Sequence, residues 1–165
     1  MGKRRAIYPG SFDPVTYGHL DIIRRARLIF EEVIVVVAVN PLKDSFFTLE
    51  ERVSFMKRAL GKDRGVKVES HEGLTVEYAK AKKARAIIRG LRATSDFDYE
   101  FQMAVTNRKL STAVDTIFLM PSESHFYISS RLIKEIARLK GDISAYVPGF
   151  VAKSIRARIS NGLQA

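Results

Sequence analysis

Short apolar segments alternate with longer segments of helical periodicity along this chain, and this alternation constrains the fold more than any other feature. Residues 33–39 are apolar throughout, rich in β-branched side chains and followed by Asn40-Pro41, which predicts a strand buried on both faces. Residues 66–69 alternate apolar and charged side chains, so we expect a strand nearer an edge of the sheet. The remaining expected strands are 5–8, 86–89 and 116–120.

Helix signals lie between these strands. Thr48 and Glu51 have the spacing of a capping box and open an expected helix that runs to about Leu60, where Gly61 ends it. Further helices are expected over 18–30, 75–83 and 96–110, from a Ser129 or Ser130 cap to Leu139, and from Pro148 onward. The alternation predicts an α/β fold, a Rossmann-like doubly wound parallel sheet of five strands with helices on both faces. The length of 165 residues suits a single domain.

Charge and composition exclude several classes of function. The chain has 28 Lys and Arg against 18 Asp and Glu, a net charge of +10, which predicts an anionic partner such as nucleic acid, a membrane surface or small polyphosphates. It has no cysteine, which excludes a disulfide scaffold, a thiolate nucleophile and a Cys-based zinc site. The longest apolar run is far shorter than the roughly 18 to 20 residues of a membrane helix, so we expect a cytoplasmic protein.

Parallel sheets of this kind bind ligands at the carboxyl ends of their strands, which directs attention to four segments. After the first strand, Gly10 and Ser11 form a turn that leads to Gly18, His19 and a helix start. Such a turn offers free backbone N–H groups and a positive helix dipole to a phosphate. The ordinary alternative is a capped turn with a solvated His19; two glycines and a hydroxyl in one strand–turn–helix unit favour the phosphate site.

The segments after the other strands carry basic and hydroxyl residues. Lys43 follows the second strand and is either a surface lysine or an anion ligand. Arg89 and Arg92 flank a glycine at the end of the fourth strand, where guanidinium groups can grip phosphate bidentately. Ser129 and Ser130 are either ordinary helix caps or a second phosphate-binding helix terminus. The basic residues of 80–85, and Lys153, Arg156 and Arg158 near the C-terminus, are expected on solvated helix faces.

These segments together resemble a known family. Gly10, Phe12-Asp13-Pro14, Thr16 and Gly18-His19 are similar to the T/H-x-G-H signature of the nucleotidyltransferase superfamily, and Ile128-Ser129-Ser130 is similar to its second signature. Arg89-Gly90-Leu91-Arg92, followed by Asp96 and Tyr99-Glu100, resembles the phosphopantetheine adenylyltransferases of bacterial coenzyme A synthesis. The resemblance extends from about Lys3 to Gly141, and implies that residues 1–165 form one nucleotidyltransferase domain.

The resemblance implies a reaction and its partners. The phosphate of 4′-phosphopantetheine would attack the α-phosphorus of ATP and give dephospho-coenzyme A and pyrophosphate. Because the attacking phosphate is already an anion, no general base is needed, and positioning with charge neutralisation suffices. The resemblance further implies Mg²⁺ held mainly through phosphate oxygens without protein ligands, a homohexamer, feedback inhibition by coenzyme A, and no nucleic-acid or membrane partner.

The resemblance also implies residue roles. His19 would stabilise the transition state by donating to the α-phosphate, with Lys43 and Arg92 as further catalytic residues. Ser11, Lys43 and Arg89 would hold the acceptor phosphate, and the backbone of Thr75 would line the pantetheine groove. The residues implied for ATP binding are Ser11, Phe12, His19, Gly90, Leu91, Arg92, Glu100, His125, Phe126, Tyr127, Ile128, Ser129, Ser130 and Arg131.

Two positions depart from the family pattern: Arg131 stands where a third small hydroxyl residue is usual, and His125 where Trp is frequent. Three other functions stay open. Another small nucleotidyltransferase, such as one acting on nicotinamide mononucleotide, would share the first signature without the block 89–100. A nucleic-acid-binding module would explain the net charge, and a purely structural assembly protein would leave both phosphate-like loops unexplained.

Overall fold

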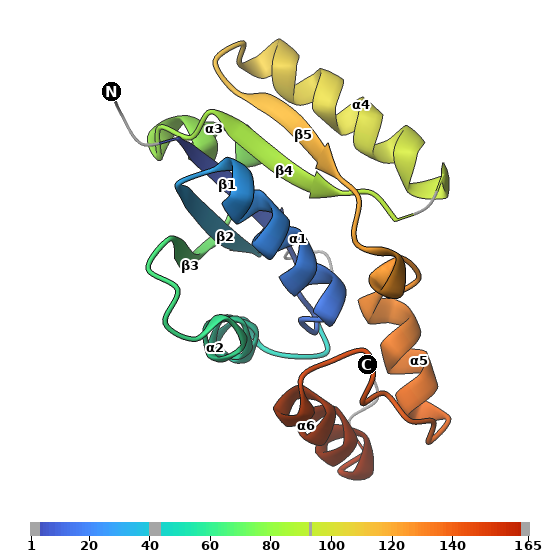
Figure 1. Ribbon diagram of the computed structural model, residues 1–165. Helices are drawn as coiled ribbons and strands as arrows, with labels where there is room; N and C mark the ends of the chain where they lie inside the picture. Colours follow the sequence, from blue (N-terminus) through green and yellow to red (C-terminus); the bar gives the residue numbers. More distant parts are fainter. Residues whose placement is uncertain (1–3, 40–43, 93, 163–165) are drawn as a thin grey trace.

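The computed structural model describes residues 4–39, 44–92 and 94–162, and Figure 1 shows a twisted sheet with helices around it. The sheet has five parallel strands in the order β3-β2-β1-β4-β5. Their bounds are β1 Arg5–Gly10, β2 Glu32–Ala38, β3 Val66–His71, β4 Ala86–Gly90 and β5 Asp115–Leu119. The predicted five-stranded parallel sheet is therefore confirmed, and the expected edge position of the third strand is also confirmed.

The helices follow the predicted order. Their bounds are α1 Tyr17–Ile29, α2 Leu49–Leu60, α3 Thr75–Ala81, α4 Thr94–Leu110, α5 Ser130–Arg138 and α6 Gly149–Ser160, and a short 3₁₀ helix, η1 Glu123–His125, was not predicted. The third helix ends two residues earlier than predicted, because Lys83 adopts a positive φ of 54° that a helix cannot continue. Pro148 is the residue before α6 instead of its first residue.

Side chains at the helix starts explain where α1, α2 and α5 begin. Thr48 accepts a hydrogen bond from the backbone N–H of Glu51 at 3.3 Å, and Glu51 accepts one from the N–H of Thr48 at 2.8 Å, so the predicted capping box is confirmed. Ser129, and not Ser130, is the N-cap of α5 and accepts from the N–H of Leu132 at 3.1 Å. Thr16 caps α1 in a second box, which includes His19.

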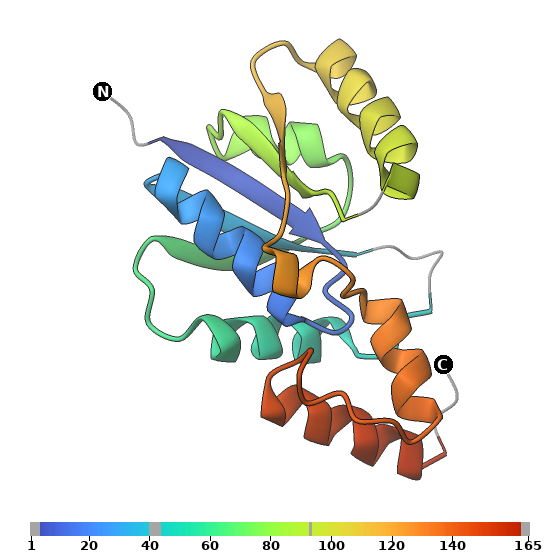
Figure 2. The same ribbon diagram turned by 45° about the vertical axis from the view of Figure 1, so that its right-hand side comes forward.

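Alternate residues of the central strands enter two separate cores, which explains the continuous apolar runs. Val33, Val35 and Val37 of β2 pack into the larger core, with apolar residues of α1, α2, α5 and α6. Ile34 and Val36 pack on the opposite face of the sheet, against residues of α3. Helices therefore cover both faces, as Figure 2 shows from a second direction, and the prediction that this strand is buried on both faces is confirmed.

One basic residue departs from the expected solvated face of the last helix. Arg158 donates to the carbonyl oxygen of Phe46 at 2.6 Å and pairs with Glu51, and its side chain is only 21% exposed. Arg156 keeps the expected surface position, where it pairs with the exposed Asp142. The expectation for Arg158 was wrong because the guanidinium reaches a carbonyl far away in the sequence, which helical periodicity does not reveal.

The strand order places a topological switch point beside β1. From β1 the chain first builds outward through β2 and β3, and then returns to place β4 and β5 on the other side. The connections after β1 and β4 therefore diverge, and a crevice opens at the carboxyl ends of these two neighbouring strands.

Candidate active site

A cavity of about 410 Å³ occupies this crevice. Three of the strand-end segments singled out from the sequence line it. The lining includes Gly10, Ser11, Phe12, Gly18 and His19 at and after the end of β1, Arg89, Gly90, Arg92 and Glu100 at and after the end of β4, and His125, Ile128, Ser129, Ser130 and Arg131 after β5. Lys43 lies outside the described residues. Leu91, Phe126 and Tyr127, although described, are not part of this lining.

A smaller cavity of about 130 Å³ adjoins the first one, and Pro9, Arg89 and Glu100 line both. Thr75 at the start of α3 lines this second cavity and not the larger one. The α4 residues Met103, Ala104 and Asn107 complete its wall, and sequence reasoning did not identify them. The two cavities meet at the Arg89–Glu100 pair, which is therefore a shared wall.

The loop after β1 folds its aromatic side chain inward. Phe12 has a positive φ of 48°, and its ring lies over Gly10, where an added Cβ would stand 2.9 Å from the ring. The ring is 1% exposed and packs edge-on against Tyr8 and His19. Gly10 thus makes room for the ring of Phe12, a buried residue in the cavity wall.

His19 is built into the start of α1. Nδ1 of the His19 ring accepts a hydrogen bond from the backbone N–H of Thr16 at 3.1 Å. The backbone N–H of His19 in turn donates to the Thr16 hydroxyl at 3.3 Å. Because a backbone N–H can only donate, the proton of the neutral ring resides on Nε2. Burial, aided by the nearby charge of Arg92, lowers the pKa of His19 to about 3. His19 is therefore a neutral hydrogen-bond donor at physiological pH, and not a solvated first-turn residue.

Arg89 and Glu100 bind each other across the boundary between the two cavities. The Nε of Arg89 donates to Oε2 of Glu100 at 2.6 Å, its Nη2 donates to Oε1, and its Nη1 donates to the carbonyl oxygen of Pro9 at 3.1 Å. Although burial acts to lower the pKa of Arg89, the hydrogen bonds and charge of Glu100 raise it overall. The two residues were predicted to contact different substrates; the structure makes them one bidentate pair.

The N-terminus of α5 faces the loop after β1. The Ser130 hydroxyl donates to the carbonyl oxygen of Pro14 at 2.7 Å, and Nη1 of Arg92 donates to the carbonyl oxygen of Ile128 at 3.3 Å. Arg131 lies at the cavity edge with its side chain 90% exposed, and it pairs with Glu135 one turn later at 3.2 Å. Ser129 and Ser130 are thus both structural residues of this helix start and lining residues of the cavity.

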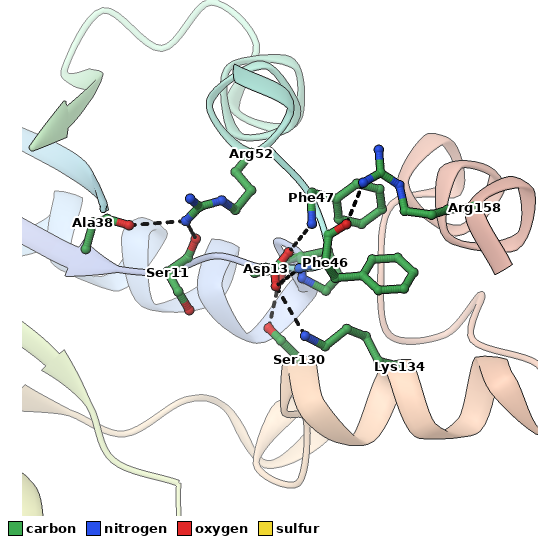
Figure 3. Close-up of polar contacts among 10 residues, drawn as sticks. Ser11, Asp13, Ala38, Phe46, Phe47, Arg52, Ser130, Lys134 and Arg158 are labelled. Atoms are coloured by element: carbon green, nitrogen blue, oxygen red, sulfur yellow. Dashed lines mark hydrogen bonds and ion pairs between the residues drawn. The ribbon is translucent and has the colours of Figure 1, made fainter. Parts of the chain in front are cut away.

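Two buried charged residues outside the sequence motifs hold the site loops. Arg52 of α2 is 4% exposed, and its Nη1 donates to the carbonyl oxygens of Ser11 at 2.8 Å and Ala38 at 3.2 Å (Figure 3). Asp21 of α1 accepts the N–H of Ser122 at 2.8 Å. Burial acts to raise the pKa of Asp21, but the hydrogen bonds of Ser122 hold it below its ordinary value. A charged residue on the apolar face of a predicted helix is the sequence signal that could have found both.

Within the residues that the structure describes, no helix has the length and apolar character needed to cross a membrane. The same residues contain no cluster of three or more His, Asp or Glu side chains placed to hold a metal ion.

The comparisons first define the class of protein. A family model described as cytidylyltransferase-like matches residues 7–136, which span the sheet and the cavity. A solved structure of a lipopolysaccharide core biosynthesis protein from Thermoplasma volcanium shares the fold, with a TM-score of 0.54 and 20% identity over 73% of this chain and 98% of that chain. The chain is therefore a nucleotidyltransferase.

Curated relatives define the family more narrowly. Phosphopantetheine adenylyltransferases from Caldanaerobacter subterraneus and Geobacter sulfurreducens are 52% and 48% identical to the chain. The alignments cover 92% of this chain and 95% of the first relative, and 97% of this chain and 98% of the second. The chain belongs to the phosphopantetheine adenylyltransferase family.

Proposed function

We propose that this chain transfers the adenylyl group of ATP to 4′-phosphopantetheine, with dephospho-coenzyme A and pyrophosphate as products. The observation that carries the proposal is the pair of adjoining cavities at the switch point, which meet at Arg89. Two substrates whose phosphates must react need two adjoining sites that hold the reacting groups close together. Membership of the phosphopantetheine adenylyltransferase family supports the same two substrates.

The larger cavity would hold ATP, because its walls carry donors suited to a triphosphate. Ser129 and Ser130 at the start of α5 would bind the β- and γ-phosphates, since a helix N-terminus favours negative charge. Arg92, whose guanidinium reaches the carbonyl oxygen of Ile128 beside this helix start, would contact the same phosphates. The acceptor phosphate would lie near Ser11 and Arg89, with Lys43 as a further ligand and the pantetheine arm along Thr75 in the smaller cavity.

The acceptor phosphate would attack the α-phosphorus directly. Negative charge then builds on the α-phosphate oxygens, and the Nε2–H of His19 is the donor that would stabilise it. A neutral donor fixed in place requires no proton transfer during the step. Because the nucleophile is already an anion, the mechanism requires no general base, and the residues of the site act through position and charge.

A Mg²⁺ ion, when bound, would neutralise part of the triphosphate charge during the transfer. Its preferred oxygen ligands would come mainly from the phosphates. Glu100, a carboxylate in the lining of the larger cavity, is already bound to Arg89 on both oxygens. This donor set suits an ion that arrives with the nucleotide.

The assembly and regulation are part of the same proposal. Helix α4 exposes Phe97, Tyr99, Phe101, Met103 and Val105, each at least 39% accessible, and this apolar surface supports burial between copies of the chain in a homohexamer. Coenzyme A carries the same pantetheine arm as the product, so it would compete for the smaller cavity as a feedback inhibitor. The enzyme would act in the cytoplasm, where ATP is available.

An acceptor comparison tests the proposal. Pyrophosphate release from ATP is measured with 4′-phosphopantetheine and with nicotinamide mononucleotide as acceptors, with and without Mg²⁺. We expect release with 4′-phosphopantetheine only. Release with nicotinamide mononucleotide alone would assign the chain to a different acceptor and overturn the proposal.

A further inference from the structure

Asp13 is a buried carboxylate for which the proposed reaction has no direct use. It lies in the loop after β1, between Ser11 and His19, and its side chain is 8% exposed. Its Oδ2 accepts the N–H of Phe46 at 2.8 Å and its Oδ1 accepts the N–H of Phe47 at 2.9 Å. The Nζ of Lys134 lies 3.2 Å from Oδ2. Figure 3 shows these contacts of Asp13. The carboxylate is therefore fully engaged by groups of this protein.

The partners of Asp13 come from separate parts of the chain. Lys134 lies on α5, whose first turn places Ser129 and Ser130 in the larger cavity. The Ser130 hydroxyl adds a second tie to the same loop through the carbonyl oxygen of Pro14. One short loop is thus joined to α5 at two points, by an ion pair and by a hydrogen bond.

The backbone that Asp13 binds is itself fixed from the other side. Arg158 of α6 donates to the carbonyl oxygen of Phe46 at 2.6 Å, and its guanidinium lies 4.7 Å from the ring centre of Phe47. Both phenylalanine rings are at most 3% exposed. The peptide groups of 46 and 47 are therefore a rigid support, and the loop after β1 is held against that support and α5 at once.

We propose that Asp13 is a positioning residue for adenylyl transfer, which sets the loop that carries Ser11 and leads into the α1 start with His19 at a fixed distance from the α5 start carrying Ser129 and Ser130. The inference rests on the proposed function, because it takes these two groups as ligands of the reacting and terminal phosphates. A contribution to stability alone does not account well for a buried ion pair at this position, since the cost of burying the two charges roughly cancels their attraction. Alignment of the two phosphate-binding elements accounts for a buried carboxylate at this position.

Glu32 offers a matched control at the opposite end of the sheet. It begins β2, its side chain is 7% exposed, and it pairs with Arg5 and, at 3.2 Å, with Lys67. Asp13 and Glu32 are therefore buried to a similar degree and each forms an ion pair, although Glu32 has two cationic partners and Asp13 has one. They differ in place, because Glu32 lies at the amino end of its strand and the cavities lie at the carboxyl ends.

Steady-state kinetics with ATP and 4′-phosphopantetheine test the inference on the full-length protein, with thermal unfolding of each variant as the stability control. Asp13→Asn leaves one backbone N–H facing an amide donor and removes the charge opposite Lys134. We expect kcat to fall by about tenfold to a hundredfold with both KM values within about threefold, because misalignment weakens the transition state more than the ground state. Glu32→Gln should lower the melting temperature by a similar amount and leave kcat unchanged.

A double variant keeps the test decisive if Asp13→Asn does not fold. Asp13→Asn with Lys134→Met removes both charges together, so no buried charge is left unpaired and the fold is spared. We expect this variant to fold and to keep the low kcat. A normal kcat in either Asp13 variant, or an equal loss of kcat in Glu32→Gln, would overturn the positioning role. Absence of wild-type activity with 4′-phosphopantetheine would instead overturn the proposed function.

Discussion

The N-termini of α1 and α5 face the same cavity but are built in different ways. At α1, Thr16 and His19 bind each other reciprocally and Thr16 is 1% exposed, so we call this helix start closed. At α5, Ser129 caps the helix without a reciprocal partner, and the nearby Arg131 side chain is 90% exposed, so we call this helix start open. The closed start suits a group that must hold one orientation in the transition state. The open start suits ligands at the solvent end of a triphosphate.

The largest expected effect comes from His19 itself. His19→Ala removes the side chain that we propose as the donor to the α-phosphate, and we expect kcat to fall by roughly a hundredfold or more, about 3 kcal/mol of transition-state stabilisation. Single-turnover adenylyl transfer, with circular dichroism to check the fold, measures this effect. Normal turnover in a folded variant would remove His19 from the chemistry and remove the functional contrast between the two helix starts.

The cap of α1 should matter more to activity than the cap of α5. Thr16→Val deletes the hydroxyl that accepts from the backbone N–H of His19 and lies 3.2 Å from Nδ1 of its ring, so the ring loses one of its two contacts with Thr16. We expect kcat to fall by roughly tenfold and the free energy of unfolding by about 1 kcal/mol, the usual cost of a lost cap. Ser129→Ala removes the corresponding bond of α5 and is the matched control for stability. A larger loss of kcat in Ser129→Ala, at equal stability, would reverse the contrast.

The pH dependence of stability sharpens the same contrast. The pKa of His19 is near 6.5 in the unfolded chain and is lowered to about 3 by burial in the folded one, so the unfolded state binds a proton that the folded state excludes. Stability from this group is therefore lost as the pH falls below about 6.5, by up to about 2 kcal/mol at pH 5. Urea unfolding at pH 7 and pH 5 measures the loss, which His19→Gln should reduce. An equal loss in that variant would assign the pH dependence to other groups.

The smallest effect is expected at the open helix start. Arg131→Ser restores the small hydroxyl that is usual in the family, and the side chain it removes is exposed and paired only with Glu135 among the contacts that the structure describes. Exposed pairs contribute little, so we expect the KM for ATP to change by less than about threefold and the melting temperature to stay nearly the same. Initial rates at varied ATP concentration measure this. A tenfold rise in KM would make Arg131 a principal ligand of the terminal phosphates.

The fold could be predicted from the sequence because the signals for its helices and strands come from residues close together in the chain. The β-branched run of β2, the Thr48–Glu51 box and the cap of α5 each depend on residues a few positions apart. The first two lie where they were predicted, and the cap is Ser129, one of the two positions predicted for it. The alternation of strands and helices then leaves few arrangements of a parallel sheet. The same locality led to the strand-end segments, three of which meet at the cavity.

The contacts that organise the site are not local, and sequence reasoning missed them. Arg89 and Glu100 lie 11 residues apart and bind each other, although the motif alone suggested two separate ligands. Asp13 and Lys134 lie 121 residues apart. A signature such as Phe12-Asp13-Pro14 shows which residues belong together in sequence, but the partner of each buried charge depends on packing between elements.

Titration of the His19 ring by nitrogen-15 NMR tests the central claim about the closed helix start most directly. Signals are assigned by comparison with variants of His71 and His125, which are the other two histidines in the chain. We expect a neutral ring with its proton on Nε2 and no titration of His19 between pH 5 and pH 8. A His19 ring that titrates near its ordinary pKa, or that carries its proton on Nδ1, would contradict the role of a fixed neutral donor.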